Sequence, residues 1–192
     1  MTTIVIAEDE AIIRLDLREL LEEEGYVVVG EAGRGDQAVE LVRQLTPDLV
    51  ILDVKMPGMD GIEAARRITS EGICAVLMLT AFSQREIVEQ ARDAGAVAYL
   101  VKPFQKAELV PAIELATARY AETKALVSEV SELTERLEVR KLLDRAKGLL
   151  IDAHGMKESD AFSFIQKSAM TQRTTMRAIA ESILKGELVP PA

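Results

Sequence analysis

Residues 49–53 read Leu-Val-Ile-Leu-Asp, in which four branched apolar residues precede a carboxylate. Apolar runs without polar alternation also occupy residues 4–7, 27–29, 74–79 and 98–101. Such runs are typical of parallel strands that are buried on both faces of a sheet. The pattern therefore predicts five buried parallel strands.

Helical patterns separate these runs. The first covers residues 10–23 and stops at Gly25, and the second is ended by Pro47. The fourth opens with a capping box at residues 83–86, Ser-Gln-Arg-Glu, and ends at Gly95. The apolar residues expected to face inward in the first three helices are Ile12, Leu15, Leu20 and Leu21; Ala38, Leu41, Val42 and Leu45; and Ile62, Ala65 and Ile68. Five repeats of strand and helix predict an α/β fold with a doubly wound five-stranded parallel sheet, whose ligand site lies at the carboxyl ends of the strands.

The pattern changes after Pro103, where residues 106–153 read as one nearly continuous helix. Pro111 is tolerated there if the helix begins close to it. Four apolar residues spaced 4-3-4 indicate about two heptads of a coiled-coil seam: Leu126, Val130, Leu133 and Leu137. The alternative is one amphipathic helix that packs on its own domain.

Two shorter helices are expected to follow His154-Gly155, over about residues 158–169 and 174–185. Their expected inward-facing residues are Ala161, Phe162, Ile165 and Ala169, and then Met176, Ile179, Ala180 and Ile183. The sequence thus predicts a long helix and a small helical domain after the sheet.

Charge is distributed unevenly along the 192 residues, whose net charge is −9. Residues 1–120 hold 12 basic and 21 acidic residues, a balance of −9, whereas residues 121–192 hold 11 of each. Residues 139–185 hold 9 basic and 5 acidic residues, a balance of +4. An acidic first part and a locally basic second part suggest two modules with different partners.

The single cysteine, Cys74, excludes an internal disulfide framework and a cysteine-based zinc site. It stands in an apolar run and is expected to be an inert core residue. No apolar run approaches the ~18 residues of a membrane span. The N-terminus reaches an acidic cluster by residue 8 and does not resemble a signal peptide, so we expect a cytoplasmic protein.

Polar residues follow four of the predicted strands: Glu8 and Asp9, Asp53, Thr80, and Lys102 with Pro103. Carboxylates at adjacent strand ends repel one another and favour a hard cation such as Mg²⁺. A carboxylate beside such an ion, with a lysine nearby, can accept a phosphoryl group. Each residue alone has a plainer explanation as a helix cap, a strand residue or a solvated lysine. The four positions together favour a functional site.

The motifs at residues 4–10, 53–61, 79–81 and 102–104 resemble receiver domains of two-component response regulators, which have a flavodoxin-like fold. The resemblance covers about residues 1–120 and implies that a sensor histidine kinase phosphorylates Asp53. It implies that Mg²⁺ is bound by Asp9, Asp53 and the main-chain carbonyl of Lys55, with Glu8 acting through water. It also implies that Thr80 and Lys102 contact the phosphoryl group, that Tyr99 is a switch aromatic, and that the bond from Lys102 to Pro103 is cis.

An enzymatic alternative is an aspartate-nucleophile phosphatase of the haloacid dehalogenase type. Those enzymes need a second acid two residues after the nucleophile, and here that position is Lys55. The sequence also has no added cap domain. We therefore expect a protein that is not an enzyme.

The run at residues 137–150, together with Ala146-Lys147-Gly148 and the later Ala161-Phe162, resembles the ANTAR domain of antitermination regulators. The resemblance implies binding to RNA stem-loops in nascent transcripts, which prevents a terminator or exposes a message. One departure is Lys157, which stands where the family has a capping Ser or Thr.

Basic residues could form an RNA-binding face, for which the candidates are Lys141, Arg145, Lys147, Lys167, Arg173 and Arg177. The plainer alternative is a solvated helical face. The expected organisation is a receiver domain (1–120), a helical coiled-coil linker (121–137) and an RNA-binding domain (126–187), with a homodimer favoured by phosphorylation. The alternative function is a DNA-binding or protein-sequestering response regulator.

Overall fold

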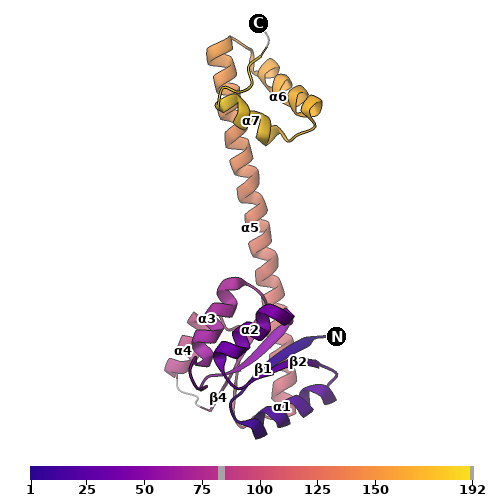
Figure 1. Cartoon of the computed structure of the whole chain (residues 1–192), viewed down its shortest axis with the longest axis vertical. Helices are drawn as coiled ribbons and strands as arrows, with labels where there is room; N and C mark the ends of the chain where they lie inside the picture. Colours follow the sequence, from indigo (N-terminus) through magenta and orange to yellow (C-terminus); the bar gives the residue numbers. More distant parts are fainter. Residues whose placement is uncertain (82–84, 191–192) are drawn as a thin grey trace. The chain divides into compact units, whose positions relative to one another are not determined.

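The computed structural model describes residues 1–81 and 85–190 (Figure 1). The chain divides into two compact units, residues 1–125 and residues 126–192. No helix of the described residues is long and apolar enough to cross a membrane.

The first unit is built on five parallel strands in the order β2-β1-β3-β4-β5. The strands are β1 (Thr3–Ala7), β2 (Val27–Ala32), β3 (Leu49–Asp53), β4 (Ala75–Thr80) and β5 (Ala98–Val101). Every residue of β3 and β4 is buried, as uninterrupted apolar runs require. The predicted five-stranded parallel sheet is confirmed.

Helices cover both faces of this sheet. They are α1 (Ala11–Glu23), α2 (Gly35–Leu45), α3 (Gly61–Glu71), α4 (Arg85–Asp93) and α5 (Lys106–His154). Val5 and Val50 pack with α2, α3 and α4, whereas Ile4 and Ile51 pack with α1 and the first turns of α5. The doubly wound arrangement is therefore confirmed. The predicted capping box lies partly outside the described residues, because residues 83 and 84 are among those not described.

Two expectations about helix faces are wrong. Ile12 and Leu15 on α1 are 77% and 54% exposed, whereas the predicted Leu21 is buried, together with Leu17, which the prediction did not include. The i,i+4 pair of leucines determines the buried face, because it places two large side chains one turn apart against the sheet. Leu45 at the end of α2 is also exposed, at 41%.

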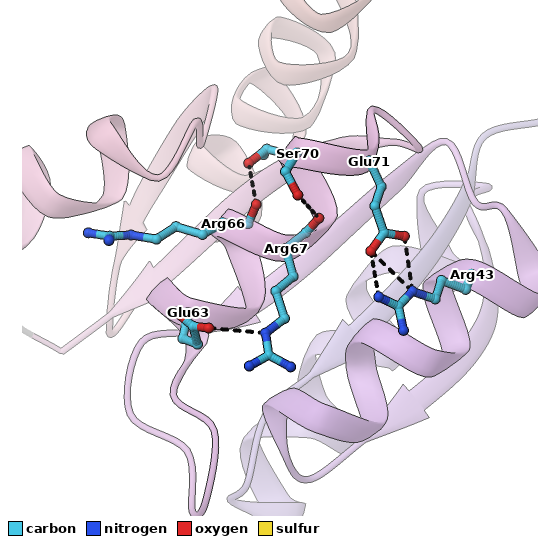
Figure 2. A network of polar contacts seen from close by, with 7 residues as sticks. Arg43, Glu63, Arg66, Arg67, Ser70 and Glu71 are labelled. Carbon is cyan, nitrogen blue, oxygen red and sulfur yellow. Dashed lines mark hydrogen bonds and ion pairs between the residues drawn. The ribbon is translucent and has the colours of Figure 1, made fainter.

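Ion pairs tie α2 to α3 on the surface of the first unit (Figure 2). Arg43 and Glu71 form a two-pronged contact, with Nε 2.9 Å from Oε2. Glu63 and Arg67 pair one turn apart within α3, at 3.0 Å. Both contacts are solvent-exposed, so each contributes only about 0–1 kcal/mol to stability.

The second unit packs the end of α5 against α6 (Glu158–Gln172) and α7 (Met176–Leu184). Its core is small and contains Ala146, Leu150, Ala161, Ile165, Ala169, Ile179, Ala180 and Ile183. The predicted long helix and small three-helix unit are confirmed. Thr175 caps α7 by accepting a hydrogen bond from the Ala178 N–H. At the start of α6, Lys157 supplies no side-chain cap.

The buried face of α6 differs from the predicted one. Phe162 is 44% exposed and does not join the core of the second unit. The core at this point takes Ala161, because its small side chain lets the three helices approach closely. α5 begins at Lys106, where the predicted helix also begins, and Pro111 lies five residues inside it.

Candidate functional site

The candidate site lies at the carboxyl edge of the sheet. Asp53 and Thr80 are the last residues of β3 and β4, and Glu8 follows the end of β1 directly. Main-chain hydrogen bonds continue the ladder past the strands, from Lys102 N–H to Thr80 O at 2.8 Å and from Glu8 N–H to Ala32 O at 3.0 Å. The parallel strands thus bring residues far apart in sequence to one edge.

Three carboxylates meet at this edge. Oxygen atoms of Glu8, Asp9 and Asp53 lie within 4.8 Å of one another. Glu8 is fully buried, Asp53 is 5% exposed and Asp9 is exposed. Asp9 and Asp53 line a cavity of about 180 Å³, together with Lys55, Thr80 and Lys102 among others. We call this cavity with its three carboxylates the acid pocket.

Lys102 neutralises part of the acid pocket. Its Nζ lies 2.5 Å from Glu8 Oε2 and 2.5 Å from Asp53 Oδ1. Burial lowers the pKa of Lys102, but the hydrogen bonds to Asp53 and Glu8 outweigh burial, so that its pKa is raised. Burial also raises the pKa of Glu8, although the hydrogen bond from Lys102 opposes the rise. The ammonium group is therefore held in its charged form between two carboxylates.

Main-chain groups fix the orientation of the carboxylates. The Lys55 N–H donates to Asp53 Oδ2 at 2.7 Å, and the Glu10 N–H donates to Glu8 Oε1 at 3.3 Å. A Cβ atom on Gly61 would lie 1.9 Å from the main-chain oxygen of Asp53, so only glycine fits there. The turn between β3 and α3 thus packs directly against the backbone of Asp53.

Sequence reasoning missed Arg14 on α1. Its Nη1 donates to the main-chain oxygen of Glu8 at 2.5 Å, and its Nε lies 3.3 Å from Glu31. This arginine supports the end of β1 from outside the carboxylate cluster. No local motif marks it, because the contact depends on how α1 packs against the loop after β1.

The donor set of the acid pocket suits a hard divalent cation. Three carboxylates and the backbone of Lys55 offer oxygen ligands, which are those that Mg²⁺ prefers. Buried like charges also gain most from a cation. The residues present therefore fit the ion that the sequence predicts.

Tyr99 and Pro103 are not among the residues that line the cavity of the acid pocket. Tyr99 on β5 is 50% exposed and lines a separate shallow cavity with Val88 and Ala91 of α4. The bond between Lys102 and Pro103 is cis. Tyr99 is thus outward-facing, away from the cavity that Thr80 lines.

The basic candidates of the second unit fall into two groups. Three are held in ion pairs: Lys141 with Glu138, Lys147 with Asp144 and Glu158, and Arg177 with Glu135 and Glu181. Among the described residues, the other three have no ion-pair partner: Arg145, Lys167 and Arg173. This unpaired group is exposed and is the better placed to meet an anionic ligand.

The predicted coiled-coil seam is exposed. Leu126, Val130, Leu133 and Leu137 are 62%, 62%, 51% and 58% exposed. None of them belongs to a core cluster of either unit, which disfavours the alternative in which this face packs on its own domain. The four large apolar side chains of the seam therefore form an exposed row along one stretch of α5.

Family comparisons match the two units separately, and the structural boundary between residues 125 and 126 falls between the two matches. Residues 4–114 match the response regulator receiver domain, and residues 131–184 match the ANTAR domain. These matches account for the parallel sheet in the first unit and for most of the second.

Relatives show the same division. The transcriptional regulatory protein PdtaR of Mycobacterium tuberculosis is 61% identical over 182 residues, which are 95% of this chain and 89% of that protein. Protein CcdB of Bacillus subtilis is 40% identical over 114 residues, 59% of this chain and 95% of CcdB.

Among solved structures, the response regulator domain of Thermotoga maritima CheB is similar, with a TM-score of 0.57 and 28% identity over 62% of this chain and 97% of that one. A chain of the CheX-CheY-BeF3-Mg+2 complex from Borrelia burgdorferi has a TM-score of 0.56 and 25% identity over 58% of this chain and 86% of that one.

Proposed function

The chain belongs to the response regulators that join a receiver domain to an ANTAR domain, a non-enzymatic family of regulators, and on that premise we propose that phosphorylation of Asp53 switches its binding to RNA. In this proposal residues 1–120 receive the phosphoryl group from a sensor histidine kinase. Residues 121–137 form a helical linker, and residues 126–187 bind RNA stem-loops to control transcription termination or access to a message.

The contact of Lys102 with both Glu8 and Asp53 carries the first half of the proposal. The carboxylate of Asp53 attacks the phosphorus of a phosphohistidine, so a P–O bond forms as the P–N bond breaks. Lys102 then faces the added negative charge, and the hydroxyl of Thr80 at the edge of the same cavity donates a hydrogen bond to it.

Mg²⁺ is the proposed cofactor. Asp9, Asp53 and the Lys55 carbonyl would hold it, with Glu8 acting through a water molecule. When bound, the ion offsets the charge of the phosphoryl oxygens. The fit of the donor set supports this assignment, as does the presence of Mg²⁺ in the similar CheX–CheY complex.

Labelling with a small phosphodonor tests the phosphorylation site. We expect wild-type protein to be labelled only when Mg²⁺ is present, and Asp53→Asn not to be labelled. The matched control is Asp60→Asn, because Asp60 caps α3 at the end of the same turn and asparagine caps equally well. Labelling of Asp53→Asn at the wild-type level would refute the assignment.

The ANTAR match and the unpaired cations Arg145, Lys167 and Arg173 support RNA as the output ligand. Binding to a hairpin RNA and to duplex DNA at the same salt concentration separates RNA binding from the alternative of a DNA-binding regulator. We expect the phosphorylated protein to prefer the hairpin RNA. A protein-sequestering regulator would bind neither nucleic acid.

The exposed seam supports the proposal that two chains pair along α5 when phosphorylated. A dimer would present two RNA-binding units to two loops of one transcript, which raises affinity by effective concentration. The competing arrangement is a closed monomer, in which the receiver unit hides the basic face until phosphorylation releases it.

A further inference from the structure

Phe162 is an aromatic side chain that the core of the second unit leaves outside. It is 44% exposed on α6, whereas its neighbours Ala161 and Ile165 are fully buried. Phe164 is the other aromatic residue after Tyr120, and it packs partly buried against the core. Of these two aromatic side chains, Phe162 is therefore the one that remains accessible to a ligand.

Phe162 lines a groove between α5 and α6, a cavity of about 490 Å³. The apolar part of the groove consists of Val139 and Leu143 with the aromatic ring. Arg136, Arg140 and Lys147 supply cationic groups along α5. An aromatic ring beside guanidinium groups is the combination on which nucleobases stack in single-stranded RNA.

The charges of the groove leave one cation available. Its three acidic residues, Glu132, Glu135 and Asp144, have partners in Arg136, Arg177 and Lys147, at 3.6, 3.7 and 2.9 Å. Arg140 has no ion-pair partner among the described residues. An anionic group that enters the groove would therefore meet a guanidinium group that has no ion-pair partner among the described residues.

We infer that this groove takes one unpaired nucleobase of the RNA loop, stacked on Phe162, with Arg140 binding a neighbouring phosphate. This inference rests on the proposed RNA-binding function and names a subsite for it. A bare phosphate would gain nothing from an aromatic ring. A paired base in a stem keeps its faces covered by its neighbours, so the subsite selects unpaired nucleotides.

A second copy of the chain is the other candidate occupant. An apolar side chain in the groove would cover Arg140 without providing a partner, and an unpaired buried charge is costly. The apolar residues that suit pairing between chains lie elsewhere on α5, from Leu126 to Leu137. The charges therefore favour a nucleotide, and the experiment below separates the two.

A tryptophan probe reads the subsite directly, because the chain contains no tryptophan. The RNA is a hairpin with a fixed stem and a randomised loop, selected on the full-length wild-type protein. We expect this hairpin to quench the fluorescence of Phe162→Trp, and the same stem closed into an uninterrupted duplex to leave it unchanged. Phe164→Trp is the matched control, two residues away and packed on the core, and its fluorescence should not respond.

Affinity measurements complete the test. We expect Phe162→Ala to weaken binding of the selected hairpin by about 5- to 100-fold, since stacking one base contributes that much. Phe162→Trp should retain wild-type affinity. The helix content of each Phe162 variant, measured by circular dichroism, should equal that of wild type because the Phe162 side chain lies outside the core.

The possible outcomes separate a failure of the Phe162 subsite from a failure of the proposed RNA-binding function. If wild-type protein selects no hairpin, the proposed function fails and the subsite with it. If wild type binds the hairpin and Phe162→Ala binds it equally, the subsite is wrong and the function stands. If Phe162→Ala changes the sedimentation of the protein but not its RNA affinity, the groove holds a second copy of the chain, and the inference is overturned.

Discussion

Lys102 determines the electrostatics of the acid pocket through two contacts of 2.5 Å, to Glu8 and to Asp53. Its ammonium group compensates buried negative charge, yet its side chain adds little to the apolar core. A phosphoryl group on Asp53 would draw this ammonium group toward itself. In the proposed switch, the residue would therefore connect phosphorylation of Asp53 to the neighbouring strand ends.

Replacing Lys102 by alanine should impair the response to phosphorylation while the fold persists. Glu8, whose pKa burial already raises, can take up a proton when its cation is lost, so the sheet stays folded. Phosphodonor-dependent RNA binding measures the response. Lys106→Ala is the control, since that lysine pairs with exposed Glu24 away from the pocket. Equal responses of Lys102→Ala and wild type would contradict the role.

Gly61 is constrained by the backbone that carries Asp53. Gly61→Ala should lower the free energy of unfolding by about 3 kcal/mol, because the added methyl group meets the Asp53 main-chain oxygen 1.9 Å away. Urea denaturation measures this change in the free energy of unfolding. Gly148→Ala in the interior of α5 is the control, since a Cβ there meets no atom within 4 Å. That change should raise helix stability by about 0.5–1 kcal/mol. Equal urea midpoints for the two variants would exclude the steric argument.

At the scale of elements, Asp48 joins the beginnings of β1 and β3. The Thr3 N–H and hydroxyl donate to Asp48 Oδ2 at 2.8 and 2.9 Å. The Thr3 backbone hydrogen bond, followed by its side-chain hydrogen bond, lowers the pKa of Asp48 below its ordinary value of 3.8. The folded state thus prefers the ionised form. The stability that this preference contributes is present above pH 3.8 and is lost as the pH falls through the lowered pKa.

Asp48→Asn should therefore cost about 1 kcal/mol of unfolding free energy at neutral pH, which is less than a buried hydrogen bond to a charged group contributes, because both contacts are exposed to solvent and the amide oxygen of asparagine still accepts. The difference in unfolding free energy between the variant and wild type should become smaller as the pH falls below the ordinary aspartate pKa of 3.8. The midpoints of urea denaturation, measured at pH values above and below 3.8, report this difference, and Asp60→Asn is the control. A difference that stays constant at every pH would show that the carboxylate charge does not matter.

The strands and the acid pocket could be predicted from local sequence patterns, whereas contacts that depend on how the elements pack could not. The strands could be predicted because their apolar runs are uninterrupted, and the acid pocket because its residues stand where those runs end. The buried face of α1 could be predicted only in part, at Leu20 and Leu21, since the apolar residues at positions 12 to 17 lie on more than one face of the helix. Arg14 was hidden because its contact with Glu8 is made across the fold.

The exposure of Phe162 in the second unit could not be predicted from the local sequence pattern either. Ala161 and Phe162 are adjacent, and either could face the core with Ile165 one turn later. The choice depends on how closely α5, α6 and α7 approach one another, which no periodicity in one helix records. The resemblance to ANTAR domains identified the family of this unit, but not which of its side chains remain exposed.

For the whole molecule, the exposed seam on α5 is the feature with most bearing on assembly. Leu133→Asp should abolish self-association of the phosphorylated protein and weaken binding to a transcript with two loops, because it places a charge among apolar residues that would be desolvated. Sedimentation and RNA binding measure the two effects. Ser128→Asp adds the same charge to the same stretch outside the seam and should change neither.

The opposite result would support the closed monomer. If the phosphorylated wild-type protein binds RNA tightly while it sediments as a monomer, pairing along α5 is not the switch. Leu133→Asp would then behave as Ser128→Asp does. Both variants add one negative charge to the same exposed stretch of α5, but only Leu133→Asp changes the apolar row, so a shared phenotype would exclude the seam.

The cores of the two units share no buried residue, and every side chain from residue 121 to residue 138 is exposed. Natural selection for stability therefore acts weakly on this stretch outside the four seam positions, since exposed substitutions rarely change stability by more than about 0.5 kcal/mol. Among descendants of one ancestral gene, this stretch should accumulate substitutions fastest and be the place where recombination exchanges one output unit for another.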